Sequence, residues 1–316
     1  MSGDDPRDAL AAVRDEIARV VVGQEAVVTG LLAALLVRGH VLLEGVPGVA
    51  KTLLSKALAA SLDLDFRRVQ FTPDLMPSDV TGQLVLDRTG GALTFRRGPV
   101  FTDLLLADEI NRTPPKTQAA LLEAMEERQV SAEGERHALS PIFTVIATQN
   151  PVEYEGTYPL PEAQLDRFQF KLHVDYPTRE QEDEVLARHD AGLDPHDLSG
   201  LRAVASAADL EAARAAVRAV HVDPAVRGYV VDLVRATRES PSVELGVSPR
   251  GATALLRGAK AWAWLAGRDF VTPDEVKTMA RPSLRHRLQL RPEVELEGGT
   301  ADGVLDGILA SVPVPR

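Results

Sequence analysis

A glycine-rich segment near residue 50 contains the residue types of a phosphate-binding loop. The segment GVPGVAKT, residues 45 to 52, follows a short apolar run and precedes helical spacing. Glycines allow backbone amides to turn inward, where they and the N-terminus of the following helix can bind phosphate oxygens. Lys51 would then reach the β- and γ-phosphates, and the Thr52 hydroxyl would bind Mg²⁺. The chemistry indicated is the binding of a nucleoside triphosphate together with magnesium.

This segment departs from the usual pattern G-x-x-x-x-G-K-[ST] at one position. Ala50 stands where the pattern has glycine. Alanine adds only a methyl group, and we expect it to be tolerated if residue 50 has helical φ and ψ. The alternative is an ordinary glycine turn between a buried strand and a helix, with Lys51 an exposed surface amine. The strand, loop and helix order favours nucleotide binding.

A pair of carboxylates ends the next informative stretch, FTDLLLADE, residues 101 to 109. At the carboxyl end of a parallel strand, Asp108 and Glu109 would lie where such sheets bind ligands. Asp108 can hold the Mg²⁺ shell, and Glu109 can polarise an attacking water. Many strands end in Asp-Glu, so this pair alone is weak evidence. Its position 57 residues after Lys51 makes a nucleotide site the better interpretation.

Further candidates follow later in the chain. Asn150 follows the apolar strand within PIFTVIATQNP and would orient the water beside the γ-phosphate, or it is only the turn residue of Asn-Pro. Phosphoryl transfer depends on positioning and charge stabilisation, so a catalytic arginine is expected. Arg167, just before an apolar strand, and Arg250, at the start of a later helix, are the candidates. Arg112, close after the carboxylate pair, competes for the same role.

Hydrophobic patterns predict the elements that position these residues. Short apolar runs predict buried strands within residues 40–44, 101–111, 141–151 and 168–177. Two alternating stretches predict β-hairpins, one in residues 82–98 around Gly90-Gly91 and one in residues 129–140 around Glu133-Gly134. From Thr178 onward the chain has helical periodicity. We therefore expect an α/β fold, with a three-layer αβα core and parallel sheet in residues 1–176 and a smaller all-α lid in residues 177–316.

The composition narrows the classes of function. The chain has 316 residues, of which 45% are hydrophobic and 26% are charged, as in ordinary globular proteins. The absence of cysteine excludes disulfides and thiolate sites. The longest mostly apolar run, residues 26–37, is too short to span a membrane, and no secretory signal is apparent, so we expect a cytoplasmic protein. The net charge of −11 makes nucleic acid an improbable partner.

The ordered series GVPGVAKT, LLLADEINR, ATQNP, YPLPEAQLDRFQF and SPRG resembles the MoxR branch of the AAA+ ATPases, which is related to magnesium-chelatase ATPase subunits. The resemblance extends from Val21 to Leu284. It implies a P-loop NTPase fold of the AAA+ type, and in that family alanine before the lysine is usual. The two expected hairpins match two insertions of the family.

The resemblance also implies a role for each candidate residue. The roles are Walker A for Lys51 and Thr52, Walker B for Asp108 and Glu109, sensor 1 for Asn150, an arginine finger for Arg167, and sensor 2 for Arg250. The implied nucleotide contacts are Val22, Gly23 and Gln24 beside the adenine, and Gly45, Val46, Pro47, Gly48, Val49, Ala50, Lys51, Thr52, Leu53 and Asp108 around the phosphates. Thr52 and Asp108 would hold the metal.

The expected function is Mg²⁺-dependent hydrolysis of ATP to ADP and phosphate. Because Arg167 lies outside its own phosphate loop, a neighbouring copy is needed to complete the site, so we expect a homo-oligomer, a hexameric ring. The resemblance implies chaperone-like remodelling or maturation of partner proteins or metal-cofactor complexes, with a partner that carries a von Willebrand factor A domain. The alternatives are a nucleotide-gated binding scaffold and a nucleic-acid-dependent motor.

Overall fold

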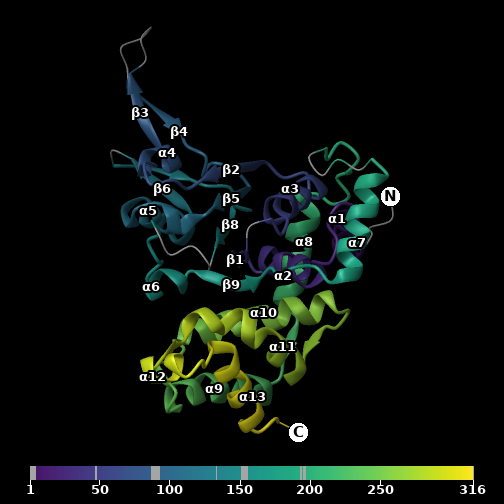
Figure 1. The fold of residues 1–316 in the computed structure, drawn as a ribbon, viewed down its shortest axis with the longest axis vertical. Coiled ribbons are helices and arrows are strands. Elements are labelled where there is room, and N and C mark those ends of the chain that lie inside the picture. The colour runs from purple at the N-terminus through teal and green to yellow at the C-terminus, as the bar shows by residue number, and fades with distance from the viewer. Residues whose placement is uncertain are drawn as a thin grey trace.

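The computed structural model describes residues 5–46, 48–86, 93–132, 134–150, 156–192, 194 and 197–315. Figure 1 shows a body built around a sheet, with a helical body packed beneath it.

A five-stranded parallel sheet forms the centre of the first body. Its strand order is β2-β5-β8-β1-β9, and all neighbouring strands are parallel. The strands are β1 (His40–Glu44), β2 (Phe66–Gln70), β5 (Leu104–Asp108), β8 (Thr144–Gln149) and β9 (Phe168–His173). β5 and β8 are buried along almost their whole length, which explains their continuous apolar runs. β1 lies between β8 and β9, while the chain after β1 crosses to β2 at the far edge.

Successive residues of the central strands alternate between two apolar layers. Val41 and Leu43 pack into the layer that contains the helices α1, α2 and α3, whereas Leu42 packs into the layer that contains α5. The helices are α1 (Pro6–Ala18), α2 (Glu25–Leu36), α3 (Lys51–Ser61), α4 (Pro77–Thr81) and α5 (Pro115–Glu127). This arrangement confirms the three-layer αβα core expected from the sequence.

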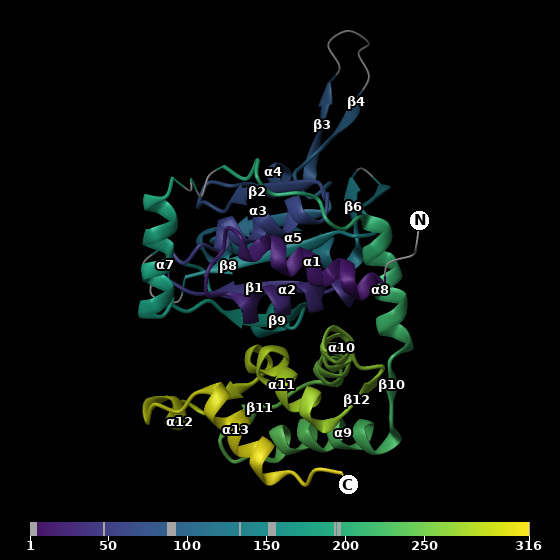
Figure 2. The same ribbon diagram turned by 90° about the vertical axis from the view of Figure 1, so that its right-hand side faces the viewer.

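Two hairpins extend from the sheet body. β3 (Gly82–Leu86) pairs antiparallel with β4 (Leu93–Arg97), and this hairpin projects beyond the rest of the molecule in Figure 2. β6 (Gln129–Ala132) pairs with β7 (Glu135–Ala138). The strands of both predicted hairpins are confirmed, although the expected Gly90-Gly91 turn and Glu133 lie outside the described residues. Gly134 has φ +83°, which suits a tight turn.

The second body is mostly helical. Its helices are α9 (Pro224–Glu239), α10 (Pro249–Leu265), α11 (Pro273–Leu284), α12 (Pro292–Leu296) and α13 (Ala301–Ser311), with the 3₁₀ turn η2 (Arg285–Arg287). The expected lid is therefore present, and it also has two short two-stranded ladders. In these, β10 (His221–Val222) pairs with β12 (Phe270–Val271), and β11 (Val243–Leu245) with β13 (Gln289–Leu290).

The lid packs against the β9 edge of the sheet. A Cβ atom added to Gly258 of α10 would come within 2.9 Å of the Phe170 ring, and Gln169 Nε2 donates to Ala254 O at 2.7 Å. Between the two bodies the chain forms α7 (Arg179–Asp190) and α8 (Ala207–Ala219). α8 contacts α1 and α2, and both helices flank the sheet body in Figure 2. The domain division at residue 176 stays a prediction.

Candidate nucleotide site

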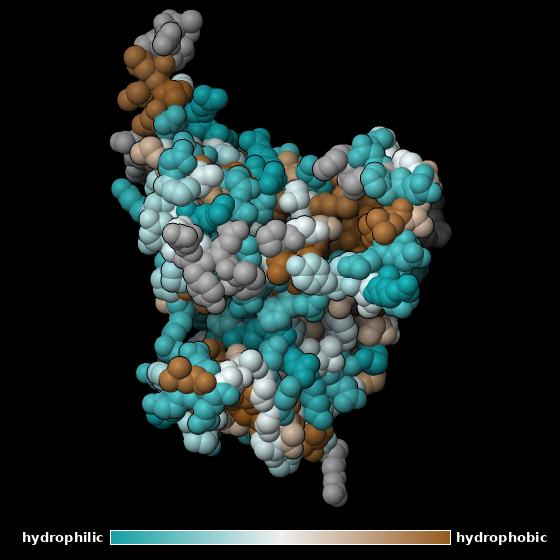
Figure 3. Space-filling view, viewed as in Figure 1, coloured by the Kyte–Doolittle hydropathy of each residue, from teal (hydrophilic) through white to brown (hydrophobic). Residues whose placement is uncertain are grey.

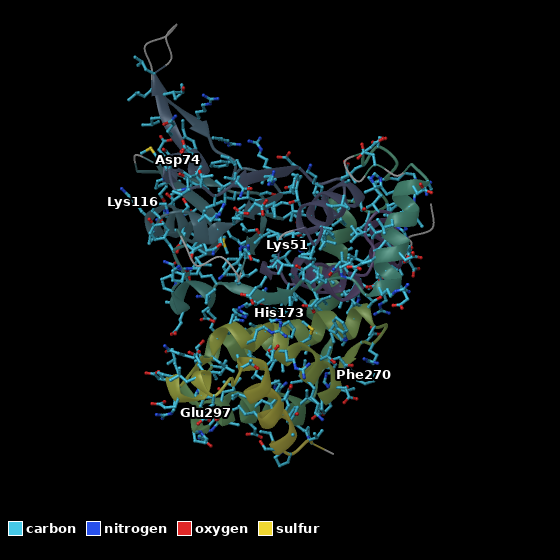
Figure 4. All side chains as sticks on the ribbon, viewed as in Figure 1. Lys51, Asp74, Lys116, His173, Phe270 and Glu297 are labelled. Carbon is cyan, nitrogen blue, oxygen red and sulfur yellow. The ribbon has the colours of Figure 1, made fainter. Side chains whose placement is uncertain are left out.

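The segment after β1 has the order strand, glycine loop and helix. Gly48 has φ +86°, and a Cβ atom added there would meet no neighbour. At Gly45 a Cβ atom would lie 2.4 Å from Val174 O, so only glycine lets the loop pass the chain that leaves β9. Lys51 begins α3, and its Nζ donates to Gly45 O at 2.5 Å. Figure 4 places Lys51 within the sheet body. Pro47 lies outside the described residues.

Ala50 does not have a right-handed helical backbone. Its φ of 61° and ψ of 19° are left-handed, and it forms the N-cap of α3. An alanine in this conformation costs roughly 1–2 kcal/mol relative to the right-handed region. The condition of helical angles at residue 50, on which tolerance of alanine was expected, is therefore not met.

Asp108 is the last residue of β5 and is held by groups from both neighbouring strands. Its Oδ1 accepts a hydrogen bond from Thr148 Oγ1 at 2.6 Å. Its Oδ2 accepts from Arg68 Nη2 at 2.7 Å and from Arg68 Nε at 3.1 Å. These contacts fix the carboxylate at the carboxyl edge of the sheet. Neither Thr148 nor Arg68 is among the site residues predicted from the sequence.

Glu109 follows directly in a left-handed backbone conformation, with φ 56°, at the start of the 3₁₀ turn η1 (Ile110–Arg112). Its backbone N–H donates to Thr148 Oγ1 at 2.8 Å. Its Oε2 accepts from Gln70 Nε2 at 2.7 Å and from Arg112 Nη1 at 3.2 Å. Arg112 therefore contacts the carboxylate of its own chain, at the same edge of the sheet as Asp108.

Asn150 completes a row of polar residues at this edge. It follows the last residue of β8 and is buried, and β8 lies between β5 and β1. The carboxyl ends of β1, β5 and β8 thus bring the phosphate loop, the carboxylate pair and Asn150 together. Adjacent parallel strands that end in polar groups form the usual ligand edge of such sheets.

A cavity of about 460 Å³ adjoins the phosphate loop, and its size is in the range of small-molecule sites. Its lining includes Val22, Gln24, Gly48, Val49, Ala50 and Leu53, as the resemblance implied, and also Tyr176, Val185, Leu186 and His189 in and before α7. Figure 3 shows apolar surface in a hollow beside α7. The side chains of α7 that line this cavity are not among the residues predicted from the sequence.

Gly23 and Gln24 link the start of α2 to the α7 segment. Gly23 has φ +76°, and a Cβ atom added there would lie 2.5 Å from Gln181 Oε1. Gln24 Nε2 donates to Asp175 O at 3.1 Å. These contacts hold the segment that contains Val22 against one end of the cavity.

The two candidate arginines lie elsewhere. Arg167 Nε donates to Glu126 Oε2 at 2.6 Å, and Arg250 Nη2 lies 3.3 Å from Glu126 Oε1. The hydrogen bond from Arg167 lowers the pKa of Glu126 despite the opposing effect of desolvation. Both arginines line a cavity of about 320 Å³. Its lining also includes His40, the first residue of β1.

This arginine cavity is at the amino edge of the sheet. The phosphate loop follows the opposite end of β1, and a five-residue strand spans about 13 Å. Arg167 and Arg250 therefore lie together, across the sheet from Lys51 of the same chain.

Comparison with known proteins agrees with this geometry. Residues 40–170 match the ATPase family associated with various cellular activities (AAA), and residues 235–308 match the AAA lid domain. YeaC of Bacillus subtilis is 47% identical over 99% of this chain and 97% of its own length. Chaperone MoxR1 of Mycobacterium tuberculosis is 41% identical, covering 95% of this chain and 81% of its own. The chain belongs to the MoxR family of AAA+ ATPases.

A solved structure supports the MoxR fold over the whole molecule. The crystal structure of a candidate ATPase from Cytophaga hutchinsonii superposes with a TM-score of 0.90 and 41% sequence identity, covering 98% of this chain and 96% of that one. The family and fold expected from the sequence are thus confirmed. In the part of this MoxR chain that the structure describes, none of the helices combines the length and the apolar composition of a membrane span.

The residues at the carboxyl edge fit a magnesium nucleotide. Magnesium in nucleotide sites is bound by one or two protein oxygens together with phosphate oxygens and water. In this MoxR chain Thr52, in the first turn of α3, and the fixed carboxylate of Asp108 are oxygen donors of the kind the ion requires. The apolar cavity beside the loop suits the base.

Proposed function

We propose that this chain hydrolyses ATP to ADP and phosphate with magnesium. The observation that carries the proposal is the meeting of three strand ends at one edge of the sheet. There the phosphate loop, the carboxylate pair Asp108 and Glu109, and Asn150 lie next to a cavity of about 460 Å³.

Each group has a separate task in this proposal. Backbone amides of the phosphate loop and Lys51 bind the phosphate oxygens, and Thr52 with Asp108 would hold the metal. When bound, magnesium neutralises negative charge on those oxygens. Glu109 polarises the attacking water, and Asn150 orients it. A chain that only bound nucleotide would have no need of Glu109 at this place, which disfavours the scaffold alternative.

We also propose that the site is completed by a second copy of the chain. Arg167 and Arg250 lie across the sheet from their own Lys51, so within one chain they cannot reach its phosphates. A head-to-tail arrangement would bring the arginine edge of one copy to the phosphate loop of the next, and repetition of this contact closes a ring. We propose six copies, as the family resemblance implies.

The work driven by hydrolysis is the last part of the proposal. The relative from Mycobacterium tuberculosis is named as a chaperone, which supports remodelling or maturation of a partner protein or a metal-cofactor complex. We propose a partner with a von Willebrand factor A domain, and we place the activity in the cytoplasm, where ATP is available. The acidic net charge of −11 makes a nucleic-acid partner unfavourable.

Hydrolysis measured against protein concentration tests the proposal. The rate per chain should rise steeply over the concentration range in which light scattering detects ATP-dependent assembly. A rate per chain that stayed constant while assembly occurred would contradict completion by a neighbour. Bound ATP without any hydrolysis in the assembled form would leave the scaffold as the function.

A further inference from the structure

The carboxylate pair Asp108 and Glu109 is tied to the edge strand β2. β2 runs parallel to β5, and Gln70 lies opposite Asp108 in the register. Arg68 precedes Gln70 by two residues, so the two side chains share one face of the strand. These are the two β2 residues whose side chains contact the carboxylate pair.

A chain of hydrogen bonds joins the two carboxylates through β2. Arg68 Nη2 donates both to Asp108 Oδ2 at 2.7 Å and to Gln70 Oε1 at 2.8 Å. Gln70 Nε2 then donates to Glu109 Oε2 at 2.7 Å. Because its oxygen faces Arg68, the amide of Gln70 presents its NH₂ group to Glu109. The orientation of Gln70 toward the water-polarising carboxylate thus depends on Arg68.

Arg68 and Asp108, which form an ion pair, differ in their exposure to solvent. The side chain of Asp108 is 12% exposed, whereas that of Arg68 is 44% exposed. Arginine keeps its positive charge at all ordinary pH values, so a guanidinium and a divalent cation repel each other at one carboxylate. Arg68 can move into solvent at small cost, while Asp108 is fixed by Thr148.

We propose that Arg68 is a positioning residue that competes with magnesium for the Asp108 carboxylate. Arrival of the metal with the nucleotide displaces Arg68 from Asp108, and Gln70 then loses the guanidinium that orients its amide. This inference rests on the proposed ATPase function and adds a control of the same site.

The test measures metal binding directly. The full-length chain is saturated with ADP, and Mn²⁺, used in place of Mg²⁺, is titrated by electron paramagnetic resonance. Arg68→Met should bind Mn²⁺ roughly two- to fivefold more tightly than the wild type, since loss of a partly exposed charged pair is an effect of this size. Arg68→Lys keeps the charge but loses the forked contact, and should fall between the two.

Arg67→Met is the matched control. Arg67 is the neighbouring residue on β2, has a similar exposure of 48%, and lies 3.9 Å from Asp65. Its substitution removes the same charge from the opposite face of the strand, so its Mn²⁺ affinity should equal that of the wild type. Thermal melting of each variant verifies folding, and the Arg68→Lys variant carries the test if Arg68→Met does not fold.

Two further measurements separate the outcomes. Without metal, the wild type and the three variants should bind ADP with the same affinity. The magnesium concentration for half-maximal ATP hydrolysis should fall in Arg68→Met by the same factor as the dissociation constant for Mn²⁺. Equal Mn²⁺ affinity in Arg68→Met and the wild type, or weaker affinity in the variant, would overturn the inference alone. A wild-type chain that bound neither ADP nor Mn²⁺ would overturn the proposed function itself.

Discussion

Arg167 and Arg250, which are 83 residues apart in the sequence, contact the same carboxylate, that of Glu126. One comes from the turn before β9 and the other from the start of α10, so the pair spans the contact between the sheet body and the lid. The shared carboxylate holds two guanidinium groups at the amino edge of the sheet. This position is the basis of the proposal that Arg167 and Arg250 act in the site of a neighbouring copy.

Replacing Arg167 by alanine should leave ATP affinity nearly intact and reduce turnover of the assembled protein by about 10³-fold or more, as for other arginines that act on a neighbour's phosphates. Arg235→Ala serves as control, because Arg235 is an exposed lid arginine with only a long contact to Glu239 at 3.7 Å. Steady-state hydrolysis and nucleotide titration measure the two quantities. Unchanged turnover in the assembled form would remove Arg167 from the site.

Replacing Glu109 by glutamine should preserve ATP binding and slow hydrolysis by about 10²- to 10⁴-fold, the usual contribution of a general base. Glu123→Gln, on the exposed side of α5, tests the effect of the same substitution away from the site. Single-turnover hydrolysis of radiolabelled ATP is the measurement. A fully active variant would exclude Glu109 as the group that polarises water.

Mixing these two inactive variants should restore activity. An Arg167→Ala chain keeps its own Glu109, and a Glu109→Gln neighbour supplies an intact Arg167. Random mixing in equal amounts then produces about a quarter of the contacts with a complete site, if the contact is head-to-tail. Absence of recovery in mixed assemblies confirmed by mass would argue that both residues serve one and the same chain.

The left-handed conformation of Ala50 gives a prediction about stability. Ala50→Gly should raise the free energy of unfolding by up to about 1 kcal/mol, because the relief of backbone strain exceeds the added flexibility of the unfolded chain. Ala60→Gly, in the last turn of α3, should instead lower it by up to about 1 kcal/mol. Urea titrations measure both. The same sign for the two substitutions would contradict the φ of 61°.

Buried His40 predicts a loss of stability in acid. Val145 N–H donates to its Nδ1 at 2.9 Å, and its Nε2 lies 3.2 Å from Met125 O. Desolvation, assisted by the positive charge of Arg128, lowers the pKa of His40 from 6.5 to about 3. The unfolded chain therefore binds a proton that the folded chain excludes. Above pH 6.5 His40 is neutral in both states and has no effect on the free energy of unfolding. Below pH 6.5 protonation of the unfolded chain lowers the free energy of unfolding, and this loss grows until the pH reaches about 3.

Urea titrations between pH 7 and pH 4 should show this decline. In the lower part of the range His40 contributes about 1.4 kcal/mol per pH unit to the slope of unfolding free energy against pH. His40→Gln, which keeps a polar side chain but cannot take up a proton, should reduce the slope by that amount. An unchanged slope would show that His40 is protonated equally in the folded and unfolded chains.

Much of the site could be predicted from the sequence because its residues lie in short contiguous motifs. The loop before Lys51 and the carboxylate pair each follow an apolar run, and the ends of parallel strands are brought to one edge by the fold. β2 was not predicted, because the segment FRRVQ at an edge of the sheet includes two arginines and shows no apolar run. The contacts of Arg68 and Gln70 were missed with it.

Other features depend on tertiary contacts that no local pattern reports. The α7 wall of the apolar cavity includes exposed side chains such as Leu186, which in the sequence look like ordinary surface residues. The meeting of Arg167 and Arg250 depends on how the lid packs against β9. The left-handed angles of Ala50 were not signalled either, since alanine rarely adopts them.

The close approach of Gly45 to Val174 has a mechanical meaning in the proposed ring. Val174 directly follows β9, and Arg167 directly precedes it, so one strand of six residues, about 17 Å long, connects them. A shift of the phosphate loop would press on one end of this strand and displace the arginine at the other. In the proposed ring, the backbone of one strand would thus link the pocket of each copy to the arginine it presents to the next.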